Sequence, residues 1–144
     1  MDQTITIIGK EFSQKVIPLI KQARDSIDII VYDWRWYSDQ IGSDIQKFNN
    51  AIVTARKKGI KVRAIINSQQ VLAILKENKI EAKQYFSSRK LHIKLMILDN
   101  KIAIFGSHNY TMSAFTTNLE VSIATQNENV VNRFKLLFNN LWLF

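Results

Sequence analysis

The sequence predicts one α/β domain over residues 1–144, with a mixed, largely parallel β-sheet sandwiched between helices. Short β-branched runs alternate with longer amphipathic segments, as strands alternate with helices in such folds. Two of these runs, 27–32 and 61–66, flank one helical segment with tight connections, which predicts a parallel β-α-β unit. With four Gly and one Pro in 144 residues, no linker divides the chain into two domains.

The chain opens with a β-branched strand at residues 4–8 and a helix at residues 11–24. Pro18 falls inside that helix and predicts a kink or a restart, because proline lacks the N–H group that the helix interior needs. Residues 27–32, IDIIVY, form a second and mostly apolar strand.

An amphipathic helix follows over residues 44–58, with Ser43 as its N-cap and Gly59 at its end. The strand at 61–66 comes directly after it. A short helix and a short strand complete this part of the chain, at residues 69–77 and 80–85.

The pattern changes after a basic polar loop at residues 86–90. Two apolar runs, 91–98 and 101–105, are joined by Asp99-Asn100 and predict a β-hairpin. A last strand and a last helix are predicted at residues 119–124 and 129–142.

The amino-acid composition limits the classes of ligand and of catalytic chemistry to consider. The chain has 20 Lys and Arg against 12 Asp and Glu, and the net charge of +8 favours a polyanionic partner, either nucleic acid or an anionic membrane face. Residues 45–101 alone hold 13 Lys and Arg against 3 Asp and Glu. Cysteine is absent, which excludes disulfides, thiolate nucleophiles and cysteine-ligated metals. Neither a signal peptide nor a run of about eighteen apolar residues is present, so we expect a cytoplasmic protein without integral membrane association.

Both histidines, His92 and His108, lie in residues 91–123. On a strand, side chains two residues apart share a face, so His92 and Lys94 point the same way. An ammonium group repels a divalent cation and attracts a phosphate, so this pair favours an oxyanion site over a metal site. Polar groups on an otherwise apolar strand cost desolvation unless something binds there.

The predicted hairpin brings the turn Gly106-Ser107-His108-Asn109 close to that pair. Glycine permits a close backbone approach, while serine and asparagine supply neutral donors and acceptors. Glu120 enters the next strand and is placed to orient an imidazole. Imidazole, ammonium, amide and carboxylate groups at one point are what nucleophilic attack on a phosphodiester requires.

The spacing His92-x-Lys94-x₄-Asp99, followed by Gly106-Ser107-x-Asn109, resembles the HxKx₄D…GSxN signature of the phospholipase D superfamily. The resemblance covers roughly residues 20–125 and implies a phospholipase D-like fold. Among members of that superfamily, a chain with one motif and this length is similar to the small nucleases of the type of the bacterial endonuclease Nuc.

The resemblance implies a role for each motif residue. His92 is expected to be the nucleophile and to form a phosphohistidine intermediate. Lys94 and Asn109 are expected to bind the non-bridging phosphate oxygens, with Ser107 in support, and Glu120 to hold the His92 imidazole in one tautomer. Two further motif residues, Asp99 and Gly106, are expected to serve structure.

The superfamily uses two such motifs, because a second histidine protonates the leaving oxygen, and this chain has one. His108 fills the variable position of its motif, so we do not take it as the second catalyst. The resemblance therefore implies a homodimer with a two-fold axis through the site, each chain giving one His92. The chemistry it implies needs no metal and no cofactor.

Four further residues are predicted to contact substrate. Trp34 and Trp36 follow the second strand and are placed to stack on bases, with a dimer contact or a core plug as alternatives. Arg89 belongs to the basic loop before His92. His108 is predicted either as a surface residue at the rim of the site or as a DNA contact.

The sequence therefore predicts a metal-independent phosphodiesterase, an endonuclease that cleaves DNA, with RNA as the other polynucleotide. Phospholipid hydrolysis or phosphatidyl transfer is the second hypothesis, although no apolar groove, membrane helix or amphipathic anchor is evident in the sequence. A catalytically silent nucleic-acid-binding domain is the third, and the intact His92, Lys94, Asn109 and Glu120 argue against it.

Overall fold

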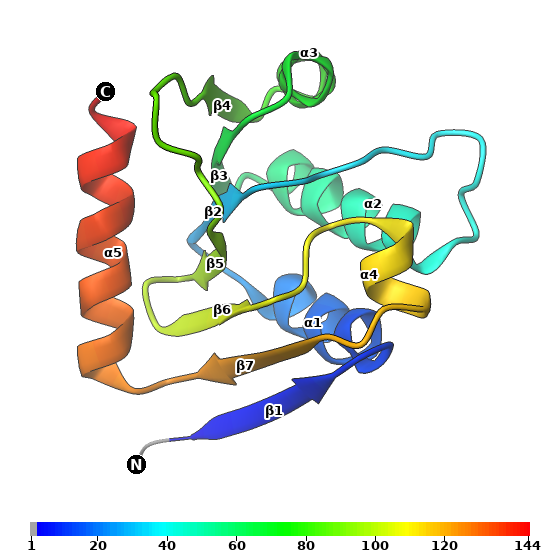
Figure 1. Ribbon diagram of the computed structural model, residues 1–144, viewed down its shortest axis with the longest axis horizontal. Coiled ribbons are helices and arrows are strands. Elements are labelled where there is room, and N and C mark those ends of the chain that lie inside the picture. Colours follow the sequence, from blue (N-terminus) through cyan, green and yellow to red (C-terminus); the bar gives the residue numbers. More distant parts are fainter. Residues whose placement is uncertain (1–2) are drawn as a thin grey trace.

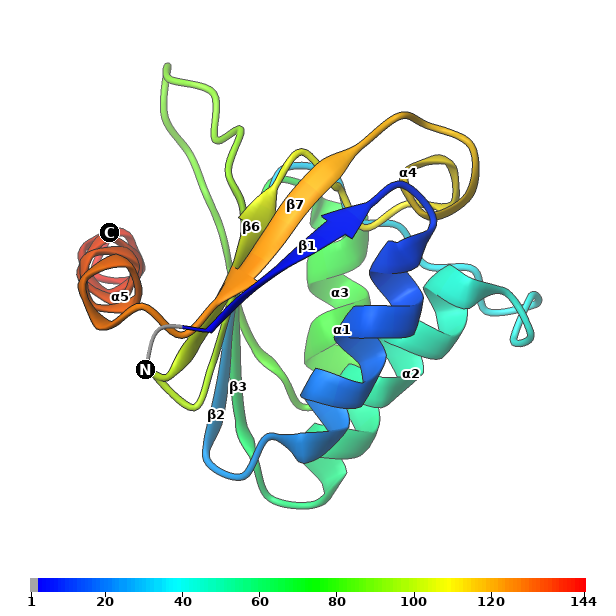
Figure 2. The ribbon, with the colours of Figure 1, turned by 90° about the horizontal axis from the view of Figure 1, so that it is seen from below.

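The computed structural model describes residues 3–144, which form a seven-stranded sheet with helices on both faces (Figures 1 and 2). Figure 2 shows α5 alone on one face and α1, α2 and α3 together on the other. The strand order is β1-β7-β6-β5-β2-β3-β4. The strands are β1 (Thr4–Ile8), β2 (Ser26–Val31), β3 (Lys61–Ile66), β4 (Glu81–Gln84), β5 (Lys94–Leu98), β6 (Ile102–Gly106) and β7 (Val121–Thr125).

The sheet is mixed, as predicted, but the prediction that it is largely parallel was wrong. Of the seven strands in residues 3–144, β2–β3 and β3–β4 pair in parallel, while β5 pairs antiparallel with β2, and β6, β7 and β1 continue antiparallel. Parallel pairs need a crossover segment, and α2 and α3 supply one each. After β4 the chain returns through a loop and a hairpin, which favours antiparallel pairing.

The helices follow the sequence pattern, with one addition. The Ser43 side chain caps α2 by accepting from the Gln46 N–H at 3.3 Å, and α1 runs through Pro18 as one helix rather than restarting. The short helix α4 was not predicted, because its single turn is too brief to show a periodic pattern. The helices are α1 (Glu11–Gln22), α2 (Asp44–Lys57), α3 (Gln69–Glu77), α4 (Met112–Thr116) and α5 (Glu128–Trp142).

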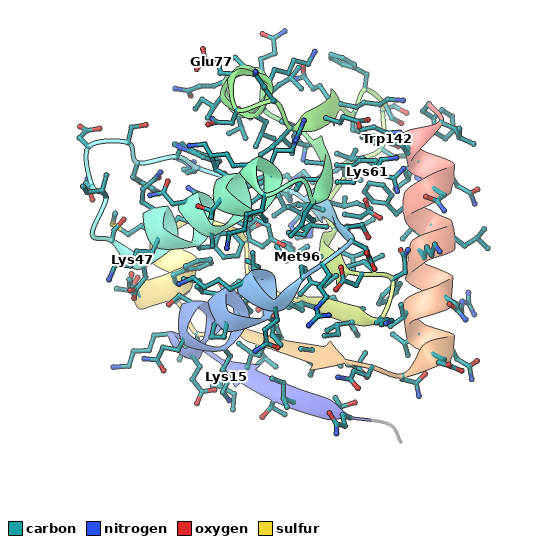
Figure 3. The ribbon with its side chains drawn as sticks, turned by 180° about the vertical axis from the view of Figure 1, so that it is seen from behind. Lys15, Lys47, Lys61, Glu77, Met96 and Trp142 are labelled. Carbon is teal, nitrogen blue, oxygen red and sulfur yellow. The ribbon has the colours of Figure 1, made fainter. Side chains whose placement is uncertain are left out.

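Apolar side chains fill both sides of the sheet. The larger cluster lies between the sheet and α1, α2 and α4, where Phe12, Phe48 and Phe115 pack together, and Met96 of β5 belongs to it in the interior (Figure 3). The smaller cluster lies under α5 and includes Phe138. The hydrophobic effect of these two layers holds the strands in one register, which fixes the edge where their polar ends meet.

Arg63 of β3 contacts both a neighbouring strand and α5. Arg63 of β3 binds Asp28 of β2 through two hydrogen bonds, of 2.9 and 3.1 Å, and the Asp28 side chain is only 3% exposed. The guanidinium also lies over the rings of Phe138 and Trp142, at 4.8 and 5.3 Å from their centroids. Burial of a paired charge between α5 and two strands therefore links three elements.

The register places several strand ends at one edge of the sheet. Val31 at the carboxyl end of β2 pairs with Lys94 at the amino end of β5, and Gly106 at the carboxyl end of β6 pairs with Ser122 of β7. The chain between β4 and β5 reaches beyond the sheet (Figure 2). This end carries the residues that the sequence predicts for catalysis, and for that reason we call it the catalytic edge below.

Candidate active site

His92 and Lys94 lie together at the catalytic edge. The Lys94 Nζ is 3.1 Å from Nδ1 and 3.2 Å from Nε2 of His92, and it can donate only to the ring nitrogen that carries no proton. His92 was predicted within a strand, but β5 begins at Lys94. The backbone at Leu91 leaves the sheet because its carbonyl accepts from the Asn67 side chain at 3.2 Å rather than from a strand.

Three residues that the sequence did not single out, Tyr32, Asn67 and Lys90, lie around this pair. The Tyr32 ring packs on the His92 ring, with centroids 4.8 Å apart, and the Lys90 Nζ lies 5.1 Å from the Tyr32 centroid. Tyr32 directly follows β2 and Asn67 directly follows β3, although Tyr32 was predicted as the last residue of its strand. That placement is the signal by which they can be recognised, because polar residues just beyond strand ends meet at one sheet edge.

Partial burial lowers the pKa of Lys94, and the positive charge of Lys90 lowers it further, while the negative charge of Glu120 acts in the opposite direction. Lys94 also lies 5.7 Å from the centroid of Tyr32. A lysine whose pKa is lowered and that lies near a second positive charge indicates an anion site, because a bound anion would stabilise both charges.

Gly106 fixes how β6 passes β7. Its φ is +155°, and a Cβ atom there would lie 2.4 Å from Cα and Oγ of Ser122 and from the carbonyl oxygen of Val121. The next residue, Ser107, exchanges backbone and side-chain hydrogen bonds with Val121, at 2.9 and 3.0 Å. The absence of a side chain at Gly106 is thus the reason that Ser107 can lie against β7.

Glu120 contacts other partners than the one predicted. Its Oε1 accepts from the Ser107 hydroxyl at 2.5 Å and its Oε2 from the Asn118 amide at 3.0 Å. Within residues 3–144 of a single chain it makes no hydrogen bond with His92. It acts on the site through Ser107 and through its charge on Lys94.

Asn109 is held beside the end of β2. Its Oδ1 accepts from the Asp33 N–H at 3.1 Å, and the neighbouring backbone is tied by Tyr110 N–H to the Asp33 carbonyl at 3.0 Å. With the oxygen engaged, the Nδ2 group is the part of Asn109 left to donate to a ligand. The structure therefore brings the imidazole, the ammonium and this amide to one edge, as the motif predicted.

The prediction that His108 contacts DNA or lies at the rim was wrong. The side chain is 1% exposed, with Nδ1 2.7 Å from the Ser122 hydroxyl and Nε2 2.8 Å from the Gly9 carbonyl. Its ring packs on Phe12 with centroids 4.6 Å apart. The Gly9 carbonyl can only accept, so Nε2 carries the proton in the neutral ring, and burial lowers the pKa of His108.

The aromatic segment after β2 divides into a buried and an accessible part. Trp34 is 3% exposed and donates from Nε1 to the Asn49 side chain at 2.7 Å, so its predicted role in base stacking was wrong and the alternative of a core plug is confirmed. Trp36 is half-buried, and Arg89 is exposed in the loop before His92. Both remain accessible to a ligand.

Asp99 lies at the other end of β5, away from the catalytic edge, as predicted. Its carboxylate accepts from the backbone N–H groups of Arg24, Asp25 and Ser26 at 2.8 to 3.1 Å. Partial burial alone would raise the pKa of Asp99, but these hydrogen bonds together outweigh it and hold the pKa below its ordinary value. Both Asp99 and Asn100 have φ of +55°, which matches the tight turn predicted for this hairpin.

An open groove of about 320 Å³ runs from His92 toward α5. Its walls are mostly apolar, and include Ile93, Phe105, Phe134 and Leu137. No apolar groove was expected from the sequence, because its walls come from β5, β6 and α5, which are distant along the chain. Among residues 3–144, no helix is long and apolar enough to cross a bilayer, and no cluster of three or more His, Asp or Glu is arranged as a metal site.

The family model described as "Cardiolipin synthase, PLD-like domain" matches residues 16–142. Mitochondrial cardiolipin hydrolase of Homo sapiens is 23% identical over 141 residues, which cover 93% of this chain and 52% of that protein. Phospholipase D Y of Dictyostelium discoideum is 30% identical, over 86% of this chain and 32% of that protein. The chain thus spans about half the length, or less, of these curated relatives.

Two solved structures share the fold over almost the whole of both chains. Nuc of Salmonella typhimurium, a phospholipase D family member, has a TM-score of 0.82 and 23% identity, covering 99% of this chain and 95% of that one. NucT of Helicobacter pylori has a TM-score of 0.81 and 20% identity, with 99% and 96% covered. Together with the family match over residues 16–142, these similarities show that the chain belongs to the phospholipase D superfamily of phosphodiesterases.

Proposed function

We propose that this protein is a metal-independent endonuclease that cleaves DNA, with His92 as the nucleophile and two chains completing each active site. One observation carries the proposal. An accessible imidazole lies 3.1 Å from a lysine ammonium, at a sheet edge that also holds the Asn109 amide. A phosphodiester bound there would have its negative charge balanced by Lys94 and its reacting phosphorus beside His92.

The reaction has two steps. In the first, a ring nitrogen of His92 forms a bond to phosphorus, the bond from phosphorus to the leaving ester oxygen breaks, and that oxygen takes a proton from a second acid. In the second, water attacks the phosphohistidine, gives up its proton to the group that acted as acid, and releases the phosphate monoester and free His92. Lys94 and Asn109 neutralise the charge that develops on the non-bridging oxygens.

The second acid is the partner's His92. The chain has two histidines, and His108 is buried with both ring nitrogens engaged, so no other imidazole of the same chain can reach the substrate. Large apolar side chains stand exposed near the catalytic edge, with Leu119 102%, Val121 60% and Ile8 58% exposed. These exposed apolar side chains beside Glu120 support a two-fold interface between two chains at this end of the sheet. Such an interface would place the two His92 side chains face to face.

Digestion of DNA in EDTA tests the proposal. Wild type is expected to cleave plasmid and single-stranded DNA between pH 5 and 8, and His92→Ala and Lys94→Ala to lose cleavage by at least about 10³-fold. Lys61→Ala removes an exposed lysine at the opposite end of the sheet and is the matched control for the loss of charge. A wild-type chain that cleaves no DNA under any of these conditions contradicts the proposal.

Light scattering tests the dimer. The proposal requires a dimer wherever there is activity, so an active monomer would contradict it. Leu119→Asp, which places a charge in the exposed apolar group, is expected to shift the chain toward monomer and to lower cleavage in the same proportion.

Phospholipid hydrolysis is the second candidate function. It is favoured by the apolar groove of about 320 Å³ beside His92, which fits an acyl chain, and by relatives named mitochondrial cardiolipin hydrolase. A cardiolipin vesicle assay run beside the DNA assay separates the two. Leu137→Asp, in the groove wall, is expected to reduce lipid hydrolysis and to leave DNA cleavage unchanged if both activities occur.

A further inference from the structure

A second hollow, of about 480 Å³, lies between the segment after β2 and the first turns of α3. We call it the Trp36 pocket. The residues that matter for its chemistry are Asp33, Arg35, Trp36, Tyr37, Gln70 and Ile74. The function proposed above does not use it.

The Trp36 pocket begins at the residue that holds the phosphate-binding amide. The Asp33 N–H donates to Asn109 Oδ1 at 3.1 Å, and the Asp33 side chain lines the pocket. Arg35 is tied to the same strand end through its N–H, which donates to the Tyr110 carbonyl at 2.9 Å. Asp33 therefore lies next to Asn109 and also lines the Trp36 pocket, which makes the two places neighbours at this end of the sheet.

The Trp36 ring gives the pocket a flat aromatic surface on a rigid support. Trp36 is half-buried, and its ring packs on Trp34 with centroids 5.8 Å apart and an interplanar angle of 38°. Trp34 is itself held by its 2.7 Å hydrogen bond to Asn49 and by an edge contact with Tyr110. The Trp36 ring is therefore preorganised for stacking, which lowers the entropy lost when a ligand binds.

Polar groups stand around that ring. The exposed Gln70 side chain offers both a donor and an acceptor. The Arg35 Nε donates to one Asp33 carboxylate oxygen at 3.2 Å, so the other oxygen and the terminal guanidinium nitrogens can bind a ligand. An acyl chain would desolvate this ion pair without replacing its hydrogen bonds. A nucleobase has a face to stack and edge groups to pair, and it suits the lining.

We propose that the Trp36 pocket binds an unpaired nucleobase next to the phosphodiester held at His92, so that the protein prefers single-stranded to double-stranded polynucleotides. The preference follows because a paired base lies inside the duplex stack and cannot reach the ring without being unpaired. This inference rests on the proposed nuclease function and names its substrate class.

The test measures binding and cleavage separately. Fluorescence anisotropy of a labelled single-stranded oligonucleotide is followed with His92→Ala, which removes turnover. Adding Trp36→Leu to that variant is expected to weaken binding by about 5- to 150-fold, the usual range for one stacked base. Gln70→Ala is expected to weaken it less, and Gln69→Ala, one residue away and outside the pocket lining, is the matched control that leaves it unchanged.

An abasic site locates the contact. Moving one abasic nucleotide along the oligonucleotide is expected to reveal one position, adjacent to the cleaved bond, where its loss and the Trp36→Leu loss are not additive. Turnover of methyl p-nitrophenyl phosphate, which carries no base, checks that Trp36→Leu leaves the catalytic edge intact. If Trp36→Leu binds the oligonucleotide as well as its parent, or wild type cleaves paired and unpaired strands equally well, the pocket inference is wrong.

Failure of the proposed function gives a different result. In that case wild type cleaves neither strand form, whatever residue stands at position 36. The anisotropy assay needs no cleavage, so it still decides the pocket: single strands that bind and depend on Trp36 support it, and strands that do not bind overturn it.

Discussion

Gly106→Ala tests the link between backbone packing and the site. The added Cβ would meet Ser122 Cα and Oγ and the Val121 carbonyl oxygen at 2.4 Å, whereas ordinary contacts begin at 3.4 Å. Two of these three atoms are backbone, so rotation of a side chain cannot relieve the overlap. The strands β6 and β7 must separate by about 1 Å, and Ser107 must move with them.

The size of the effect follows from two costs. Overpacking costs about 1–3 kcal/mol. A non-glycine residue at φ +155° costs a further ~1–3 kcal/mol. A loss of roughly 4 kcal/mol is a large part of the ~5–15 kcal/mol that such domains have, and in a chain of this length it lowers Tm by about 10–15 °C. A displacement of about 1 Å at the site lowers kcat/KM by about 10²-fold.

Urea unfolding and DNA cleavage well below Tm measure the two effects. Gly42→Ala is the matched control, because a Cβ at Gly42 would have no atom within 4 Å and the residue has no positive φ. It is expected to keep full activity and to gain up to about 1 kcal/mol from the less flexible unfolded chain. If Gly106→Ala is as stable and active as Gly42→Ala, the close approach of β6 to β7 does not hold the site.

Three further predictions concern charge. Because burial lowers the pKa of His108, the unfolded chain binds a proton at this residue more readily than the folded chain does. The stability that the neutral ring contributes is therefore fully present above about pH 6.5 and is lost as pH falls through the folded pKa. Urea unfolding should show a lower free energy of unfolding at pH 5 than at pH 7.5 in wild type, and a smaller difference in His108→Asn. Arg63→Met leaves the Asp28 carboxylate buried and unpaired and should cost about 3–5 kcal/mol, most of it recovered in Arg63→Met/Asp28→Leu; equal stability of single and double variants would contradict this. If Lys94 acts as an ammonium, its lowered pKa makes kcat/KM fall on the alkaline side at a pH below the usual lysine range. Lys90→Gln should shift that fall to higher pH in a pH–rate profile, and an unchanged profile would assign the fall to another group.

The sequence predicted the elements well wherever a periodic pattern ran long enough. The strand at Thr4–Ile8 and the helix at Gln69–Glu77 have the predicted bounds, and the Asp99-Asn100 turn joins the predicted hairpin. What the sequence could not predict was the order of strands. The antiparallel return of β5 beside β2 depends on packing between segments far apart in the chain, which local periodicity does not record.

The same distinction holds for the candidate site. The sequence spacing was enough to predict that His92, Lys94 and Asn109 lie at one edge of the sheet, because a hairpin and a turn are local structures. Burial depends on the whole fold, so His108 and Trp34 were mistaken for ligand contacts although the core encloses both. Trp36, two residues later, stays accessible because the chain there has left the sheet.

Trapping the covalent intermediate tests the central claim most directly. A single-stranded oligonucleotide is mixed with the protein in EDTA, the reaction is quenched within one turnover under conditions that preserve phosphohistidine, and the peptides are sequenced by mass spectrometry. The account predicts a phosphoryl-linked oligonucleotide on His92 in wild type and none in His92→Ala. Cleavage without any adduct on His92, or undiminished cleavage by His92→Ala, would contradict it.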